Sequence, residues 1–280
     1  MSMKHVISVG GGLSSTAFLP MEVLKTVPAK DVVMVMAKLP NEDPDVWRLV
    51  KAAEDKFGIE VQMIGDNETP FDAFNRAKFL GNSRIDPCSN LLKRQVLRHW
   101  VMKTYPLGTA ILYTGIGAYE IDRQMSIVRN WKDAGYEMRM PLLDKPELTR
   151  EYMMAECQKM FGFIPRLYLM GFTHNNCGGA CIKAGMKEWS RLLYFLPDVF
   201  SWWAENERQF RLVHGDYTIL RQTVNGQKQY LTLDEFRTVT LSRWNCTPPD
   251  FPSVDGWERV VTTTPDYDET AACSFCDAIA

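Results

Sequence analysis

The chain has 280 residues, of which 46% are apolar and 24% charged, and its formal net charge is −2 at pH 7. These values are ordinary for a globular protein, and they exclude the strong basic field of a non-specific nucleic-acid binder, although a local basic patch is compatible with them. The sequence has no apolar run of about 18 residues and no signal-peptide core, so we expect a cytoplasmic protein with no membrane partner.

The first element is a strand that ends at three consecutive glycines. Residues 5–9 are mostly apolar, and a helix-like stretch at 17–27 follows the glycines and three hydroxyl residues. Glycine lets a ligand approach the backbone, and the amides at a helix start favour an anion. The candidate phosphate-binding residues are Gly10, Gly11, Gly12, Ser14 and Ser15. A turn that only connects two elements is the alternative.

The glycine turn does not match either of the two best-known nucleotide motifs. It is not a P-loop, because no Lys follows the glycines. It is not a dinucleotide fingerprint, because the glycines at 10–12 are contiguous and no third Gly stands where that motif requires it.

Strand and helix patterns then alternate up to about residue 145. Apolar runs predict strands at 32–37, 59–64 and 109–114, and helical patterns occupy 44–57, 70–80, 89–105 and 119–130. This alternation predicts an α/β fold with a doubly wound parallel sheet flanked by helices. Ligands of such sheets lie at the carboxyl ends of the strands. The turns at 10–12 and 115–117 are therefore candidate walls of one pocket.

The pattern changes after about residue 145. Helices are predicted at 147–161, 186–196 and 199–210, around an irregular stretch at 165–184 that is rich in Gly, Asn and Cys. We therefore predict a nucleotide-binding α/β domain over 1–145 and a mixed, mostly helical C-terminal extension over 146–280.

The cysteines form a second group of candidate residues. Cys157 falls in a helical pattern and is expected in the core. Clustered cysteines in a cytosolic protein are more often metal ligands or redox groups than disulfides. The candidate metal ligands are Cys88, Cys177, Cys181, Cys273 and Cys276. Two glycines between Cys177 and Cys181 favour a sharp turn of the kind that presents sulfur to a metal or iron–sulfur site. Loop cysteines without a ligand, and a functionless tail, are the alternatives.

Charged residues follow two of the predicted turns. Ser89 is predicted to cap a helix, which places Cys88 where a thiolate is stabilised and Lys93 one turn later. Lys93 would reach a phosphate or belong to a solvated face. Glu120 and Arg123 are three residues apart on a predicted helix, so they either form a local salt bridge or enter the pocket.

Taken together, these segments resemble the PP-loop ATP-pyrophosphatase superfamily, and within it the phosphoadenosine-phosphosulfate reductase-like branch. The resemblance covers about residues 5–200, and its most specific parts are 87–93, 115–123 and 171–181. The superfamily motif Ser-Gly-Gly-x-Asp-Ser corresponds to residues 10–15 of this chain. Gly10 replaces the first Ser of that motif, and Ser14 replaces its Asp.

The resemblance implies an enzyme that adenylates an acceptor with ATP and releases pyrophosphate, with Mg²⁺ on the leaving group. The implied adenine contacts are Met36 and Ala37, Gly115 lines the site, and the candidate catalytic residues are Lys93, Glu120 and Arg123. The acceptor would be a small molecule or a nucleic acid, modified by sulfur transfer from a sulfur donor. The cysteines would hold a [4Fe–4S] cluster, with Cys273 or Cys276 as a fourth ligand, and the chain would be able to form a homodimer.

Two other functions stay open. A sulfonucleotide reductase would use Cys273 or Cys276 as the nucleophile on a mobile tail. A non-catalytic nucleotide- or redox-sensing module would agree with Ser14, which stands where the superfamily has Asp.

Overall fold

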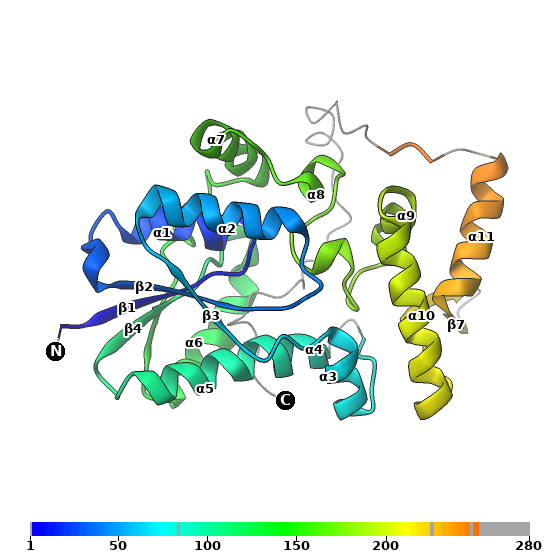
Figure 1. The fold of residues 1–280 in the computed structure, drawn as a ribbon, viewed down its shortest axis with the longest axis horizontal. Helices are drawn as coiled ribbons and strands as arrows, with labels where there is room; N and C mark the ends of the chain where they lie inside the picture. Colours follow the sequence, from blue (N-terminus) through cyan, green and yellow to red (C-terminus); the bar gives the residue numbers. More distant parts are fainter. Residues whose placement is uncertain (1, 83–84, 225–226, 247–248, 252–280) are drawn as a thin grey trace. The chain divides into compact units, whose positions relative to one another are not determined.

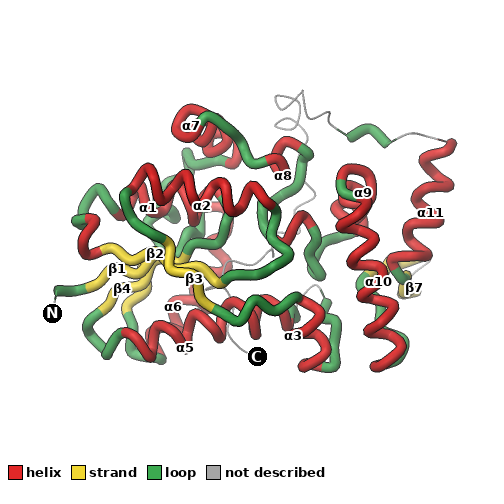
Figure 2. Tube along the Cα trace, viewed as in Figure 1, coloured by secondary structure: helices red, strands yellow, loops and turns green. Residues whose placement is uncertain are grey.

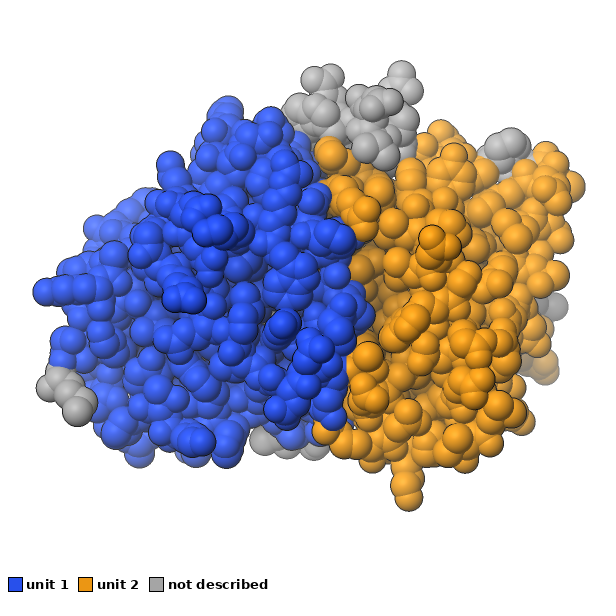
Figure 3. Space-filling view, viewed as in Figure 1, with its two compact units in different colours: residues 1–68, 89–165, 272–280 blue, residues 69–88, 166–271 orange. Residues whose placement is uncertain are grey.

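The computed structural model describes residues 2–82, 85–224, 227–246 and 249–251 (Figure 1). The chain forms two compact units (Figure 3). Among the described residues, unit 1 comprises 2–68 and 89–165, and unit 2 comprises 69–88 and 166–251 apart from the gaps. No helix of the described part is long and apolar enough to cross a membrane.

Unit 1 is built on a parallel five-stranded sheet (Figure 2). Its strands are β1 Lys4–Ser8, β2 Val32–Ala37, β3 Val61–Ile64, β4 Ala110–Tyr113 and β5 Glu137–Arg139. Their order is β3-β2-β1-β4-β5, and every neighbouring pair is parallel. The predicted parallel sheet is confirmed. The strand order reverses between β1 and β4, which is where ligands of such sheets bind.

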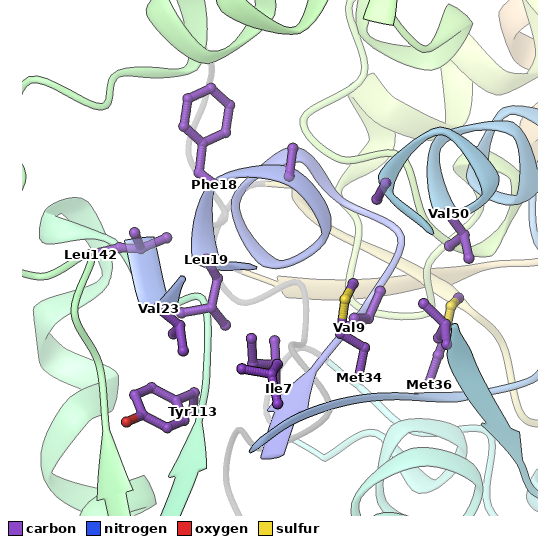
Figure 4. Packing of buried hydrophobic residues seen from close by; sticks show 14 of the residues in the cluster. Ile7, Val9, Phe18, Leu19, Val23, Met34, Met36, Val50, Tyr113 and Leu142 are labelled. Carbon is purple, nitrogen blue, oxygen red and sulfur yellow. The ribbon is translucent and has the colours of Figure 1, made fainter. Parts of the chain in front are cut away.

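Helices cover both faces of this sheet. Figure 1 shows α1, α2 and α7 on one side and α5 and α6 on the other. The helical elements of unit 1 are η1 Ser14–Phe18, α1 Leu19–Val23, η2 Ala29–Asp31, α2 Pro44–Phe57, η3 Asn90–Arg94, α5 Gln95–Thr104, η4 Ala118–Arg123, α6 Gln124–Asp133 and α7 Arg150–Phe161, and α4 Pro87–Ser89 leads directly into η3. Successive residues of a strand point to opposite faces. Ile7 accordingly packs with Met34 on the side of α1 and α2 (Figure 4), and Val6 packs with Leu112 on the other side.

The compact units do not divide the chain at residue 145. Met153 and Phe161 of α7 pack against the core of unit 1, so residues 146–165 stay with the sheet. Phe71 and Phe74 instead belong to the core of unit 2, so 69–88 leaves the α/β unit. Burial of these aromatic side chains, rather than the change of pattern along the sequence, determines the units.

Unit 2 is mostly helical, as predicted for the C-terminal part. Its elements are α3 Pro70–Ala77, α8 Arg166–Leu169, η5 Cys177–Gly179, α9 Met186–Phe195, α10 Pro197–His214, β6 Leu220–Val224, β7 Gln227–Leu231 and α11 Leu233–Cys246. The antiparallel pair β6 and β7 forms a second sheet. Trp189, Phe200 and Trp203 lie in the core of unit 2, and each is at most 1% exposed.

A buried carboxylate joins three of these elements. Glu207 of α10 is 1% exposed, and its two oxygens accept hydrogen bonds from the backbone amides of Ile219 (2.7 Å) and Leu233 (2.6 Å). Burial raises the pKa of Glu207 to about 6, although the two amides and Arg211 oppose that rise. Glu207 of α10 therefore connects the start of the β6–β7 hairpin and the start of α11 through hydrogen bonds. Above a pH of about 6 its buried carboxylate is charged, which is unfavourable.

This geometry predicts a pH-dependent stability. The ordinary pKa of Glu207 is 4.5, so between pH 4.5 and about 6 the folded protein binds this proton more tightly than the unfolded chain. Protonation of Glu207 therefore stabilises the folded protein. This stabilisation is fully present below pH 4.5 and is lost as the pH rises through 6. We expect Glu207→Gln to remove about 2 kcal/mol of this decline in the free energy of unfolding. Urea unfolding of the wild type and of Glu207→Gln at pH 4.5 and 7 measures this difference. An equal decline in the free energy of unfolding of the two proteins would contradict the prediction.

Candidate nucleotide-binding site

The glycine turn after β1 is closed by the hydroxyl groups that follow it. The Gly10 amide donates to Ser15 Oγ and the Gly11 amide to Thr16 Oγ1, each at 3.0 Å. The Thr16 amide in turn donates to the Gly12 carbonyl at 3.0 Å. Ser15 and Thr16 are buried. Three backbone amides and two hydroxyl groups of this region therefore form hydrogen bonds that stabilise the turn.

Ser14 takes a different position in the turn. The helical path begins at Ser14, as a π-helical turn that continues into α1, rather than at residue 17 as predicted. Gly12 and Ser14 are half-buried, whereas Ser15 is buried. Ser14 thus occupies the first helical position, where backbone amides point away from the helix and attract an anion.

Gly11 is required by both its backbone and its surroundings. Its φ is +81°, and a Cβ at this position would lie 2.6 Å from Cγ1 of Val46. Val46 lies in the first turn of α2, whose N-cap Asp43 accepts a hydrogen bond from the Asp45 amide at 3.0 Å. The glycine turn is therefore packed against the N-terminal end of α2.

A matched pair of variants separates these two effects. Gly58→Ala introduces a side chain at a φ of +66° with nothing within 4 Å, so we expect a loss of about 1–2 kcal/mol from the left-handed conformation alone. Gly11→Ala adds the contact with Val46, and we expect a further loss of about 1–3 kcal/mol. Urea unfolding measures both losses, and Val46→Ala should relieve only the second. Equal losses in the two single variants would contradict this account.

The turn after β4 touches the glycine turn directly. A Cβ on Gly115 would lie 2.7 Å from Cα and 2.8 Å from the backbone nitrogen of Ser15. Ile7 and Tyr113 are paired across β1 and β4, so both turns leave the sheet at the same edge. The sequence predicts that these two turns are walls of one pocket. The structure shows that they are in contact, and the pocket stays a prediction. They meet where the strand order reverses.

A buried ion pair lies beside the N-terminus of α2. Lys93 Nζ is 2.9 Å from Glu42 Oε1, and the two side chains are 8% and 0% exposed. The sequence leaves two roles open for Lys93, contact with a phosphate or a place on a solvated face, and its burial argues against the second. The structure adds Glu42 to the candidate site. A buried Lys and Glu separated by 51 positions cannot be paired from local sequence.

Ser89 does not cap a helix. The helix begins at Pro87, and Ser89 has helical backbone angles with no capping hydrogen bond. Proline is favoured in the first turn of a helix, since its missing amide hydrogen would have no partner there. The side chain of Ser89 is consequently inside the helix, one turn before Lys93, and its hydroxyl is buried.

Glu120 and Arg123 adopt the local arrangement. Arg123 Nη1 is hydrogen-bonded to Glu120 Oε1 within η4. The Gly117 amide donates to the other carboxylate oxygen of Glu120 at 3.5 Å. This is the salt bridge that the three-residue spacing predicts. Their role in catalysis stays a prediction.

The predicted adenine contacts lie in the strand core. Met36 and Ala37 are 2% and 4% exposed, and Met36 packs among the apolar side chains between the sheet and α2 (Figure 4). Lys38 is the first exposed residue after β2. Met36 therefore offers a base no side-chain surface in this arrangement, and the contact stays a prediction.

The three described cysteines that were predicted to bind metal all belong to unit 2. Cys88, Cys177 and Cys181 are half-buried thiols. Pro87, next to Cys88, and Ile182, next to Cys181, both lie within 3.3 Å of a Cβ built on Gly81. Asp86 and Lys183 form a buried ion pair at 3.7 Å across the same two segments. The structure thus brings the segments of Cys88 and Cys181 together.

These cysteines do not form a metal centre by themselves. Within residues 2–251, where described, no three His, Cys, Asp or Glu side chains are grouped closely enough to hold a metal ion. Cys273 and Cys276, the other predicted ligands, lie outside the described residues. Cys157 is buried, as expected, and burial raises the pKa of its thiol to about 12. Cys157 is therefore an unreactive core residue.

Comparisons with known proteins add little to this geometry. No protein-family model matches the sequence, and no curated protein matches it. Among solved structures, the U34-tRNA thiolase NcsA from Methanococcus maripaludis, with its [4Fe–4S] cluster, is similar with a TM-score of 0.37 and 14% sequence identity. The match covers 77% of this chain and 74% of that chain. At this TM-score we draw no conclusion from the match about the fold or the activity of this chain.

Proposed function

We propose that this chain binds ATP through the glycine turn after β1 and transfers its adenylyl group to an acceptor. The observation that carries the proposal is the contact between Gly115 and the backbone of Ser15. It joins two glycine turns at the point where the strand order reverses, beside the start of a helix. Such a point favours a nucleotide, and a helix start favours its phosphates.

The phosphates would lie against Gly12 and Ser14, two half-buried residues of the turn. The bonds from Gly10 and Gly11 to Ser15 and Thr16 hold this surface in place before the nucleotide arrives. A preformed set of donors lowers the cost of ordering the site on binding.

In the proposed reaction an acceptor oxygen or sulfur attacks the α-phosphorus of ATP. A bond from the acceptor to the α-phosphorus forms, the bond from that phosphorus to the α–β bridging oxygen breaks, and pyrophosphate leaves with the bonding electrons. Lys93, held by Glu42 at 2.9 Å, and Arg123 are our candidates for stabilising the developing charge. Mg²⁺, bound mainly through the phosphates, would neutralise the leaving group.

The acceptor is a small molecule or a nucleic acid in this proposal, and sulfur transfer is its proposed chemistry. The described residues alone do not provide a ligand set for a [4Fe–4S] cluster, so we assign no step to one. Iron and zinc analysis of the purified protein tests whether Cys88, Cys177 and Cys181 hold a metal with ligands outside the described residues.

Analysis of the reaction products tests the proposal. The protein is incubated with ATP and Mg²⁺, with water or a panel of nucleophiles as acceptor, and the nucleotides are separated by ion exchange. We expect AMP or an adenylated acceptor together with pyrophosphate. ADP and phosphate would contradict the proposal. Bound ATP without any cleavage would also contradict it and would favour the nucleotide-sensing alternative.

A further inference from the structure

Two buried polar groups near the proposed nucleotide site have no hydrogen-bond partner among the described residues. Both polar atoms of the Asn41 side-chain amide, Oδ1 and Nδ2, are buried without a hydrogen bond among the described residues. The same holds for the hydroxyl of Ser89. Buried polar groups are normally hydrogen-bonded, so each unpaired one requires an explanation. A polar ligand that binds between them would supply the missing partners.

The buried ion pair brings these two groups into one region of unit 1. Asn41 directly precedes Glu42, so their Cα atoms are about 3.8 Å apart. Ser89 lies one helical turn before Lys93 on the same helix. The contact of 2.9 Å between Glu42 and Lys93 therefore joins the segment of Asn41 to the segment of Ser89.

This region lies beyond the carboxyl end of β2, which pairs with β1 in the sheet. Five residues after Asn41, Val46 packs against Gly11 of the glycine turn. When the phosphates of a nucleotide occupy the glycine turn, its nucleoside extends to one side of that turn. Asn41, with its unpaired amide, lies on the side of β2, so we place the nucleoside on that side.

We propose that Asn41 reads the adenine base of the bound nucleotide, an inference that rests on the proposed ATP site. An amide side chain matches adenine through two hydrogen bonds, in which Oδ1 accepts from N6 and Nδ2 donates to N7. Guanine presents two acceptors on the same edge, so the amide would satisfy only one of them. Asn41 is therefore a residue that determines specificity for adenine, and it takes no part in the chemical step.

Analogues of ATP test this assignment together with a variant. We expect the wild-type protein to bind ATP about 5- to 150-fold more tightly than 7-deaza-ATP, which lacks the N7 acceptor. In Asn41→Ala that ratio should fall to about one, and ATP should bind no more tightly than 7-deaza-ATP binds the wild type. Tripolyphosphate, which has no base, should bind both proteins equally. Asn206→Ala removes an exposed amide of unit 2 that donates to the Trp202 carbonyl, and it should leave all three affinities unchanged.

The stability of the protein without nucleotide distinguishes base recognition from a structural role. Because the Asn41 amide forms no hydrogen bond within the part of the chain that the structure describes, its removal should leave the thermal midpoint unchanged or raise it. A lowered midpoint with equal weakening of ATP and tripolyphosphate would overturn the inference. An unchanged ratio of ATP to 7-deaza-ATP in Asn41→Ala would overturn it as well, while leaving the ATP site intact. If neither ATP nor tripolyphosphate binds the wild type, the proposed function itself fails.

Discussion

Glu42→Ala should lower the free energy of unfolding by about 3–5 kcal/mol, the range found when one member of a buried ion pair is removed. Glu42 and Lys93 are 0% and 8% exposed, and their contact of 2.9 Å is shielded from water. The variant leaves the Lys93 ammonium buried without this carboxylate. Urea unfolding at pH 7 measures the loss.

Two further variants separate stability from function. The pair Glu42→Leu with Lys93→Met removes both charges and should recover most of the lost stability, whereas ATP affinity should stay low because the Lys93 cation is gone. Asp55→Ala disrupts an exposed ion pair with Lys51, whose side chains are 68% and 66% exposed. It should leave the urea midpoint unchanged. A Glu42→Ala protein as stable as Asp55→Ala would contradict a structural role for the buried pair.

Gly115→Ala should weaken ATP binding at least tenfold and reduce the free energy of unfolding by about 1–3 kcal/mol, as expected for an overpacked site. The new methyl group would lie 2.7 Å from Cα of Ser15, and a backbone atom cannot rotate away as a side chain can. The glycine turn must therefore move, and the hydrogen bond from Gly10 to Ser15 moves with it. Calorimetric titration with ATP measures the change in affinity.

The matched control for this variant is two residues away. A Cβ on Gly117 has nothing within 4 Å, and the φ of −94° suits any residue. Gly117→Ala should therefore bind ATP like the wild type. Similar affinities for Gly115→Ala and Gly117→Ala would show that the contact between the two turns does not shape the nucleotide site.

The sequence was sufficient for the central strands and for the turns that follow them. Runs such as Val32–Ala37 are apolar throughout, because a parallel strand is covered on both faces. The short edge strand Glu137–Arg139 was not predicted, since its residues are charged or only partly buried and show no apolar pattern. The contact of Gly115 with Ser15 follows from strand order, which the alternation of strands and helices indicates only in outline.

The rest of the site depends on contacts between distant segments. The pairing of Glu42 with Lys93 forms only when the segment after β2 and the helix formed by η3 and α5 are packed on the same sheet. The helix start at Ser14 depends on hydroxyl groups that bond back to the glycine amides, although Ser and Thr are weak helix formers. The unpaired amide of Asn41 is visible only when every neighbouring donor and acceptor is known. Local patterns cannot reveal any of these three features.

The claim that the phosphates of ATP bind at the two glycine turns of unit 1 is tested most directly by hydrogen–deuterium exchange with and without ATP. We expect slower exchange in the peptides that cover residues 8–18 and 113–118 when ATP is present. Slower exchange confined to other parts of the chain, or no change at any peptide under saturating ATP, would contradict it.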